Sequence, residues 1–368
     1  MYGGASGKSA STLHLGGKDM KLVWDMDPTP GNGRNSEGSF IRIPDGGILF
    51  AYSRYTSDTA EDDDCCDIAA IYSYDEGETW SEPRVIVKAE SFGVKNIMSV
   101  SCIYQLDGRI GVYFLIKEVD HTISFGRALS KDGFFFEPER MTHNGIPAYY
   151  VMNNDRVERF ADGKLYFPAA CHLLTDGKND AFGLTVLFVS DDDGKTLKKL
   201  PHYWTISKLD DNGVGLQEPG VMEHKDGTVH IWARTKHDSQ YESFSTDGMK
   251  TFTAPSPSFW GCPNSPLEFA RNEETGVLYA VYNPYGRSLL ADKGTSWGRT
   301  PLVIRKSMDD GKSWSFPFVV EEEPDRGYCY PAVFFTKDHA MLCSYCRGGK
   351  EDYNCLARLG IMKIGLDE

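Results

Sequence analysis

Apolar and polar residues alternate along the chain in short runs, and the runs come in pairs separated by a tight turn. Residues 40–52 (FIRIPDGGILFAY) and 221–233 (VMEHKDGTVHIWA) show this pattern, with Asp-Gly between two alternating runs. Alternation with a period of two predicts strands with one buried face, and Asp-Gly between such strands predicts a hairpin. Helical periodicity is essentially absent. The chain therefore predicts an all-β fold with six hairpins, whose turns are Asp45-Gly46, Asp107-Gly108, Asp162-Gly163, Asp226-Gly227, Thr275-Gly276 and Asp338-His339.

An octapeptide recurs at intervals of roughly 60 residues, as expected of a repeat architecture. Complete copies are 73–80 (SYDEGETW) and 307–314 (SMDDGKSW), the copy at 190–197 (SDDDGKTL) lacks the aromatic residue, and shorter copies begin at Ser130 and Ser245. In Ser-x-Asp-x-Gly-x-Thr-Trp, the Ser and Asp side chains can bond the amides of a turn, and Gly adopts a strained backbone conformation. The Trp is expected to pack between neighbouring units.

Six hairpins and five octapeptides predict a β-propeller of six blades, the last of which lacks the octapeptide. Residues 21–27 (KLVWDMD) are expected to pair with the C-terminal run 355–365 (CLARLGIMKIG), so that the first and last parts of the chain share one blade. This pairing closes the ring and removes open sheet edges. We predict a single propeller over residues 21–368 and a flexible leader or tag over residues 1–20.

The charge balance argues against two classes of partner. The chain carries 39 basic and 53 acidic residues, a formal net charge of −14, which disfavours nucleic acid and anionic membranes. No apolar run reaches the roughly 18 residues that a membrane-spanning helix needs. A small acidic ligand stays compatible with these totals, because a local cluster of arginines can reverse the field inside a pocket.

The nine cysteines are scattered and show no metal-binding spacing. Cys343 and Cys346 are two residues apart but fall within a predicted strand, and no second pair completes a zinc site. We therefore expect free thiols, no metal and no organic cofactor. Free thiols favour a cytoplasmic protein, whereas removal of a signal peptide would make it a secreted one.

Candidate pocket residues follow from the hairpin geometry. The innermost strand of each propeller blade lines the central axis, and the residues that enter it open onto one end of that axis. Nine residues before the second turn residue stand Glu37, Ser99, Asn154, Glu218, Leu267 and Tyr330. Polar neighbours add Arg34, Asn35, Asn96, Asp155, Arg156, Gln217 and Tyr328. The second strands return to the same end with Arg54, Lys117, His172, Arg234, Arg287 and Arg347. Arginines around a glutamate and a tyrosine predict a pocket for an anion.

These motifs resemble those of the sialidase (neuraminidase) superfamily over nearly the whole chain from about residue 21. The octapeptide is similar to the Asp box of that family, QEPGVMEHKDGTVHIWAR to its glutamate strand, and GYCYPAVFF to its tyrosine strand. The resemblance implies that Tyr330 is the nucleophile and Glu218 its base, with Arg234 and Arg299 binding the substrate. The acidic stretch DTAEDDDCCD stands where the family carries its acid/base aspartate, which favours Asp62 first and Asp64 second.

One departure marks the chain as an outlying branch of the family. The family's first arginine belongs to a motif that FIRIP (40–44) resembles, but Arg42 stands only four residues before Gly46, too late in the strand to reach the pocket. Glu37 holds the register expected for that arginine. We expect Arg34 to take its place from the preceding loop.

The resemblance implies a retaining exo-glycosidase that acts on a terminal acidic sugar, sialic acid or a related 2-keto or uronic sugar. A neutral phenol approaches an anomeric centre bearing a carboxylate with less repulsion than a carboxylate nucleophile would, and Glu218 would take its proton. Two alternatives stay open: a glycosidase or lyase acting on a different acidic sugar, and a carbohydrate-binding propeller without catalysis. The predicted substrate-binding residues are Arg34, Glu37, Asn96, Asp155, Arg156, Gln217, Arg234 and Arg299; the sequence leaves the oligomeric state open.

Overall fold

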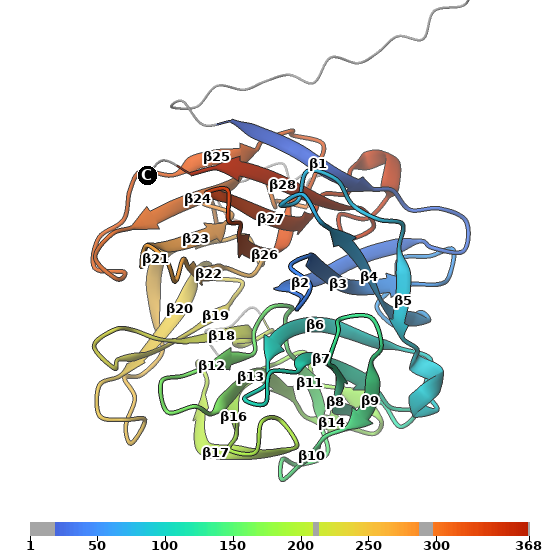
Figure 1. Cartoon of the computed structure of the whole chain (residues 1–368). Helices are drawn as coiled ribbons and strands as arrows, with labels where there is room; N and C mark the ends of the chain where they lie inside the picture. Colours follow the sequence, from blue (N-terminus) through green and yellow to red (C-terminus); the bar gives the residue numbers. More distant parts are fainter. Residues whose placement is uncertain (1–18, 209–212, 287–296, 367–368) are drawn as a thin grey trace, which may run out of the picture.

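The computed structural model describes residues 19–208, 213–286 and 297–366, which form six antiparallel blades in a ring (Figure 1). From the axis outward, blade 1 is β2 (Arg34–Arg42), β3 (Ile48–Tyr55), β4 (Cys66–Ser73) and β5 (Arg84–Val87). Blade 2 is β6 (Ile97–Tyr104), β7 (Ile110–Lys117), β8 (Ile123–Ser130) and β9 (Glu137–Arg140). The prediction of an all-β six-bladed propeller is confirmed.

Blade 3 departs from this plan because its inner strand is split. Its strands are β11 (Tyr149–Val151) with β12 (Glu158–Arg159), then β13 (Leu165–His172), β16 (Leu184–Ser190) and β17 (Thr196–Trp204). The short strand β10 (Thr142–His143) pairs in parallel with β17, and β14 (Leu174–Thr175) with β15 (Lys178–Asn179) forms a separate ribbon. The split leaves residues 152–157 without strand pairing at the axis.

The last three blades return to four strands each. Blade 4 is β18 (Gln217–Glu223), β19 (Val229–Arg234), β20 (Asp238–Ser245) and β21 (Ser256–Cys262). Blade 5 is β22 (Glu268–Arg271), β23 (Leu278–Tyr282), β24 (Leu302–Ser307) and β25 (Phe318–Glu321). Blade 6 is β26 (Cys329–Phe335), β27 (Ala340–Cys346), β28 (Leu359–Gly365) and β1 (Met20–Met26). The described helices are short 3₁₀ turns, Ala89–Phe92 and Lys350–Asp352.

The two ends of the chain close the ring within blade 6, as predicted. Strand β1 runs antiparallel to β28, with Met20 opposite Ile364 and Met26 opposite Leu359 (Figure 1). Ion pairs reinforce the closure, because Arg347 on the loop after β27 donates to Asp25 of β1 at 2.8 Å. Of the segment predicted as a leader, residues 1–18 lie outside the described part of the chain.

Both repeated turns have the predicted conformations. The second residue of all six hairpin turns is left-handed, with φ between 59° at His339 and 96° at Gly46. In the first Asp box, the amide of Gly77 donates to the Ser73 hydroxyl at 2.8 Å, and the Thr79 amide donates to Asp75 at 2.9 Å. The other four boxes repeat these Ser and Asp contacts at the turn between the third and fourth strands.

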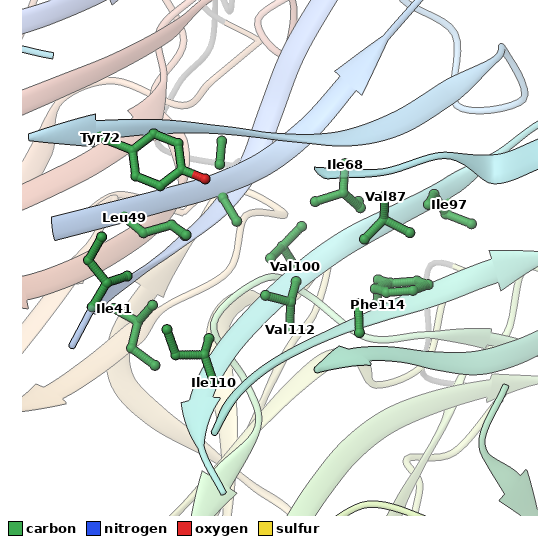
Figure 2. Close-up of a cluster of buried hydrophobic side chains, with 14 of the residues drawn as sticks. Ile41, Leu49, Ile68, Tyr72, Val87, Ile97, Val100, Ile110, Val112 and Phe114 are labelled. Carbon is green, nitrogen blue, oxygen red and sulfur yellow. The ribbon is translucent and has the colours of Figure 1, made fainter. Parts of the chain in front are cut away.

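The hydrophobic core lies between neighbouring blades. Figure 2 shows one such cluster, in which Leu49, Ile68 and Val87 of blade 1 pack with Val112 and Phe114 of blade 2. Trp80 of the first Asp box belongs to a similar cluster between blades 1 and 6, 6.2 Å from the Phe40 ring centroid. Burial of these alternating apolar faces is the main favourable contribution to folding.

Trp80→Ala is expected to lower the free energy of unfolding by about 3 kcal/mol, because it empties part of the space between two blades. Urea unfolding monitored by circular dichroism measures the change. Phe316→Ala is the matched control: this side chain is 94% exposed, so its loss should change stability by less than about 0.5 kcal/mol. Equal effects of the two substitutions would contradict an inter-blade role for Trp80.

A β-bulge interrupts the inner strand of four blades at the positions predicted to face the pocket. The register shifts there, and Glu37, Ser99, Glu218 and Tyr330 have φ of 56°, 65°, 42° and 55°. A positive φ is rare in residues other than glycine. A β-bulge beside an active site redirects one side chain out of the regular alternation along the strand. The repeated bulge therefore explains why one spacing rule finds a pocket residue in blade after blade.

All nine cysteines lie in the described part of the chain and are free thiols, as expected. None of the helices described there is both long and apolar enough to cross a membrane.

Candidate active site

A cavity of about 360 Å³ opens at one end of the propeller axis. It is lined by Glu37, Asp62, Met98, Ser99, Leu115, Lys117, Ile123, Tyr149, Tyr150, Val151, Met152, Asn153, His172, Asn179, Ala181, Gln217, Glu218, Arg234 and Tyr330. The bulge residues of blades 1, 2, 4 and 6 all belong to this lining. The cavity therefore gathers side chains from four inner strands that are far apart in the sequence.

Tyr330, Glu218 and Arg234 form one contact network in this cavity. The Tyr330 hydroxyl donates to Glu218 Oε1 at 2.9 Å, and Arg234 Nη1 donates to Glu218 Oε2 at 2.6 Å. The same Arg234 nitrogen lies 3.3 Å from the Tyr330 hydroxyl oxygen, and Arg234 Nη2 donates to Gln217 at 2.8 Å. A proton on the tyrosine thus has a carboxylate acceptor within hydrogen-bond distance, beside a fixed positive charge.

Burial and the neighbouring Glu218 raise the pKa of Tyr330 well above its ordinary value, so the phenol is protonated at rest. Two guanidinium groups oppose this effect. Arg299 lies over the Tyr330 ring, 5.7 Å from its centroid, and Arg234 contacts the hydroxyl. Arg299 itself lies outside the cavity lining, where it donates to Cys329 Sγ at 3.1 Å and to the Asn264 carbonyl at 3.1 Å.

Arg34 is buried beneath the pocket, and its guanidinium is occupied by acidic neighbours. Nη1 donates to Asp62 Oδ1 at 2.5 Å, Nη2 lies 3.2 Å from Glu37 Oε2, and Nε donates to the Ser36 hydroxyl at 2.8 Å. The guanidinium carbon also lies 4.4 Å from the centroid of the Tyr55 ring. The expectation that Arg34 lines the pocket is therefore corrected: it supports Glu37 and Asp62, which do line it.

The two carboxyl groups that contact Arg34 have pKa values shifted in opposite directions. Burial raises the pKa of Glu37 to about 7, although Arg34 opposes the shift. Desolvation would raise the pKa of Asp62 as well, but the charge and hydrogen bond of Arg34 outweigh it and hold this pKa below its ordinary value. Near neutral pH, Asp62 is therefore ionised at rest, whereas Glu37 keeps its proton to a higher pH than an ordinary carboxyl group.

Hydrogen bonds from Asn96 and Lys117 hold the loop that carries Asp62 in place. The buried Asn96 amide donates to the Asp62 carbonyl at 3.2 Å and to the Asp64 carbonyl at 2.6 Å, and Lys117 Nζ donates to the Asp62 carbonyl at 2.5 Å. Asp64 turns into its own loop, where it accepts from the hydroxyl of Thr59, and it is not part of the cavity. Of the two predicted acid/base aspartates, the structure brings only Asp62 to the pocket, and Asn96 positions it from outside the lining.

Asp155 and Arg156 lie away from the pocket, which corrects the expectation that they shape it. Asp155 accepts from the Ser39 hydroxyl at 2.5 Å and lines a cavity at the hairpin-turn end of the axis. Arg156 is buried, with Glu268 at 2.5 Å. The inner strand of blade 3 is split, so the residues of this blade that line the pocket come earlier in the sequence, at 149–153. Asp155 already lies further along the axis, toward the hairpin turns. Arg42 lies at the hairpin end with Glu76, as expected.

Three of the six second-strand residues predicted to reach the mouth line the cavity: Lys117, His172 and Arg234. Burial lowers the pKa of His172, and its Nδ1 lies 2.8 Å from the Asp180 carbonyl. A carbonyl can only accept, so Nδ1 carries the proton and Nε2 is left as an acceptor. Arg54 and Arg347 are not in the lining, and Arg287 lies outside the described residues.

Sequence reasoning missed the apolar wall of the cavity, which consists of Met98, Leu115, Ile123, Tyr149, Tyr150, Val151 and Met152. It also missed Asn153, a buried residue of the lining whose amide has no hydrogen-bond partner among the described residues. The constant spacing to the hairpin turn identifies polar residues at strand entrances, and an apolar wall has no such signature in the sequence. In blade 3 the pocket residues precede the counted position by up to five residues, and nothing in the spacing predicts that offset.

Asn154 joins three inner strands at the axis without lining the pocket. Its Nδ2 donates to the Gly38 carbonyl at 2.7 Å and lies 3.4 Å from the carbonyl of Tyr330. The amide of this buried side chain thus couples the backbones of blades 1, 3 and 6. It positions the segment that carries the candidate nucleophile.

In the described part of the chain, no group of three or more His, Cys, Asp or Glu side chains is arranged to hold a metal ion. The polar groups in the cavity instead contact one another. The arrangement can transfer a proton from Tyr330 to Glu218 and can present Asp62 at the mouth.

Six blades, five Asp boxes and a polar cavity at the axis define an Asp-box β-propeller. The chain belongs to the family of BNR repeat-like domains, whose family model matches residues 35–343. No curated protein sequence matches it.

Solved structures share the fold at low sequence identity. A protein of unknown function from Dyadobacter fermentans is 17% identical, with a TM-score of 0.69 over 95% of this chain and 99% of that one. The Hadza microbial sialidase Hz136 is 15% identical, with a TM-score of 0.68 over 90% of this chain and 66% of that one. The NanB sialidase of Streptococcus pneumoniae is 12% identical, with a TM-score of 0.68 over 94% and 70%. This chain thus spans about two thirds of each sialidase, and the likeness establishes the fold.

Proposed function

We propose that the protein is a retaining exo-glycosidase that removes a terminal acidic sugar, sialic acid or a related 2-keto sugar, with Tyr330 as nucleophile. The observation that carries the proposal is the 2.9 Å hydrogen bond from the Tyr330 hydroxyl to Glu218, within a cavity that also holds Arg234 and Asp62. The sialidase neighbours support the same class of reaction.

In the first step, the Tyr330 oxygen bonds to the anomeric carbon and its proton passes to Glu218. The bond to the leaving oxygen breaks, and Asp62 donates a proton to that oxygen. Arg234 stabilises the negative charge that develops on the phenol oxygen. In the second step, water attacks the anomeric carbon and gives a proton to Asp62. The bond to Tyr330 breaks, and Glu218 returns the proton to the tyrosine, so the configuration is retained.

The Arg34–Asp62 pair explains how this site can bind an acidic sugar although Arg34 is occupied at rest. A substrate carboxylate can replace the Asp62 carboxylate on Arg34, because both are anions that fit one guanidinium. Asp62 then loses the partner that keeps its pKa low and can take up from water the proton that it later donates to the leaving oxygen. This exchange couples substrate binding to the protonation of Asp62.

Asp62→Asn is expected to slow cleavage strongly, because it removes the acid. It is also expected to bind the free acidic sugar about fivefold to tenfold more tightly than the wild type, since Arg34 loses its anionic competitor. Isothermal titration and steady-state kinetics measure the two effects. Asp63→Asn is the matched control, because Asp63 is the exposed neighbour and pairs with Lys117 instead. Weaker sugar binding by Asp62→Asn would contradict the exchange.

Cleavage of a uronic sugar is the second candidate. One observation favours it: of the three arginines predicted to clamp a substrate carboxylate, Arg234 is the one found in the cavity lining formed by the described residues. A site with one directly accessible guanidinium is compatible with an acid group placed elsewhere on the ring than in sialic acid.

A panel of chromogenic glycosides of sialic acid, other 2-keto sugars and uronic acids tests the proposal. The expected result is release of the chromogen from one member, with the product first appearing by proton NMR in the anomeric configuration of the substrate. A fluorinated analogue of that sugar should label the peptide containing Tyr330, detected by mass spectrometry. Inversion, an unsaturated product, or binding without cleavage would each reject a retaining hydrolase.

The raised pKa of Glu37 predicts a stability contribution that depends on pH. Because the folded-state pKa is about 7, above the ordinary value of 4.5, folding favours the protonated form. The contribution is full below pH 4.5 and is lost as the pH rises through 7, by about 3 kcal/mol in total. Urea unfolding of the wild type and of Glu37→Gln at pH 5 and pH 8 isolates it, since the other buried acids contribute equally to both proteins. A stability difference between them that does not change with pH would contradict the prediction.

A further inference from the structure

A cavity of about 230 Å³ lies between blades 4 and 5. Blade 4 contributes residues of all four of its strands, and blade 5 contributes Phe269 of β22 and Trp314 of its Asp box. None of the residues that line this cavity also lines the candidate active site. The described residues of the two blades thus leave a separate space between them unfilled.

The wall of this inter-blade cavity is largely aromatic, with the side chains of Phe244, Phe259, Trp260, Phe269 and Trp314. The ring centroid of Trp260 lies 4.2 Å from that of Phe259 and 4.8 Å from that of Trp314. Phe259 is 62% exposed, whereas Trp260 and Phe269 are buried, so the cavity reaches the surface beside Phe259. An apolar cavity of about 150 Å³ can hold benzene, so this one has room for an aromatic ring with a small substituent.

Glu242 and His230 form a polar spot in this aromatic lining. Glu242 Oε1 accepts from Trp260 Nε1 at 3.1 Å, and no donor among the described residues contacts Oε2. His230 is 4% exposed, and its Nε2 lies 3.1 Å from Glu242 Oε1 without forming a hydrogen bond to any described residue. A buried polar atom without a partner destabilises the fold, so a ligand that supplies the partner is favoured.

The charges in and around the cavity favour an uncharged ligand. Glu242 repels an anion, and burial and the nearby His230 lower the pKa of His224, so this second imidazole of the lining is neutral at pH 7. Outside the lining, the guanidinium carbon of Arg305 lies 5.9 Å from the centroid of the Phe259 ring, where it repels a second cation. The ligand that fits is therefore a neutral ring with a hydrogen-bond donor for Glu242.

We propose that the inter-blade cavity is a binding site for a small phenol, an uncharged aromatic ring that carries one hydroxyl group. The ring packs against the Phe and Trp side chains, and contacts between aromatic rings are favourable. The hydroxyl donates to Glu242 Oε2, and a hydrogen bond to an ionised acceptor is stronger than one between neutral groups. Because a hydroxyl also accepts, it can serve the neighbouring Nε2 of His230 in either protonation state. The site is independent of the proposed glycosidase activity.

Phenol and its methyl ether anisole test the two parts of this proposal, because anisole keeps the ring and the oxygen but has no hydrogen to donate. Binding is followed by NMR of the full chain with ¹³C-labelled methionine methyl groups. Met222 reports on the inter-blade cavity, and Met98 and Met152 report on the candidate active site. Phenol is expected to shift the Met222 signal and to bind at least about tenfold more tightly than anisole.

Three substitutions locate the site. Glu242→Gln keeps an acceptor for Trp260 but removes the charge, so phenol should bind about fivefold more weakly while anisole binding is unchanged. Glu274→Gln is the matched control, since this exposed acid lines only the cavity at the hairpin-turn end, which Met222 also lines. Phe259→Ala removes part of the wall at an exposed position, so the fold should persist and both probes should bind more weakly.

Equal affinities for phenol and anisole, or equal losses in Glu242→Gln and Glu274→Gln, would overturn the proposal. Shifts confined to Met98 and Met152 would assign phenol to the candidate active site instead. The proposal would also be overturned if about 10 mM phenol left the Met222 signal unchanged, since a well-fitted ligand of this size binds more tightly than that.

Discussion

Tyr330→Phe is expected to reduce glycoside cleavage by about three orders of magnitude or more while leaving the fold intact. The substitution removes one oxygen, which is the atom proposed to bond to the sugar. Tyr330 donates one hydrogen bond, to Glu218, so the cost to stability should be about 1 kcal/mol. Initial rates on the cleaved glycoside and the urea unfolding midpoint measure the two effects.

The same blade provides a matched control for this substitution. The buried Tyr345 hydroxyl donates to Glu321 at 2.9 Å, the same kind of bond over the same distance, but it lies outside the pocket lining. Tyr345→Phe should therefore cost comparable stability and leave activity unchanged. An undiminished rate in Tyr330→Phe would reject the nucleophile, and equal losses in both variants would mean that the effect is structural.

Deletion of residues 1–27 is expected to abolish cooperative unfolding, because it removes β1 from blade 6. Strand β28 would be left with an open edge, and the apolar side chains of Leu22, Trp24 and Met26 would no longer cover the clusters beside it. Arg347, which is 7% exposed, would also lose Asp25 as a partner. Differential scanning calorimetry measures the outcome.

Deletion of residues 1–18 is the matched control and should leave the melting temperature nearly unchanged. A synthetic peptide of residues 19–28 added to the longer deletion should restore part of the transition, since it can pair with β28. If both deletions melt like the full chain, ring closure by β1 does not stabilise the fold.

The architecture could be predicted because each blade repeats the same local signals. A two-residue turn needs a left-handed second residue, and five of six carry Gly while His339 takes that conformation in the sixth. The pocket positions of blades 1, 2, 4 and 6 followed from a constant distance to that turn. The rule failed in blade 3, where the inner strand is split between β11 and β12, and in blade 5, where Leu267 is part of the core.

The partners of the charged residues could not be predicted, because they depend on contacts between distant segments. Arg34 was expected to line the pocket, yet in the structure it pairs with Asp62, 28 residues further along the chain. Arg156 pairs with Glu268, 112 residues away. Spacing within one strand shows where a side chain enters the axis. It does not show which opposite charge is nearest once six strands converge.

The four bulge residues with positive φ lower the stability of the protein, yet they place side chains in the pocket where the proposed chemistry takes place. A non-glycine residue in this conformation costs about 1 kcal/mol, and glycine would relieve the strain at Glu37, Ser99, Glu218 and Tyr330. Each relief would also remove a side chain from the pocket. Glycine in place of Glu37, Glu218 or Tyr330 would lose buried hydrogen bonds and packing that outweigh the relief of strain. Selection for heat resistance alone is therefore expected to introduce glycine first at Ser99, whose side chain is the smallest of the four.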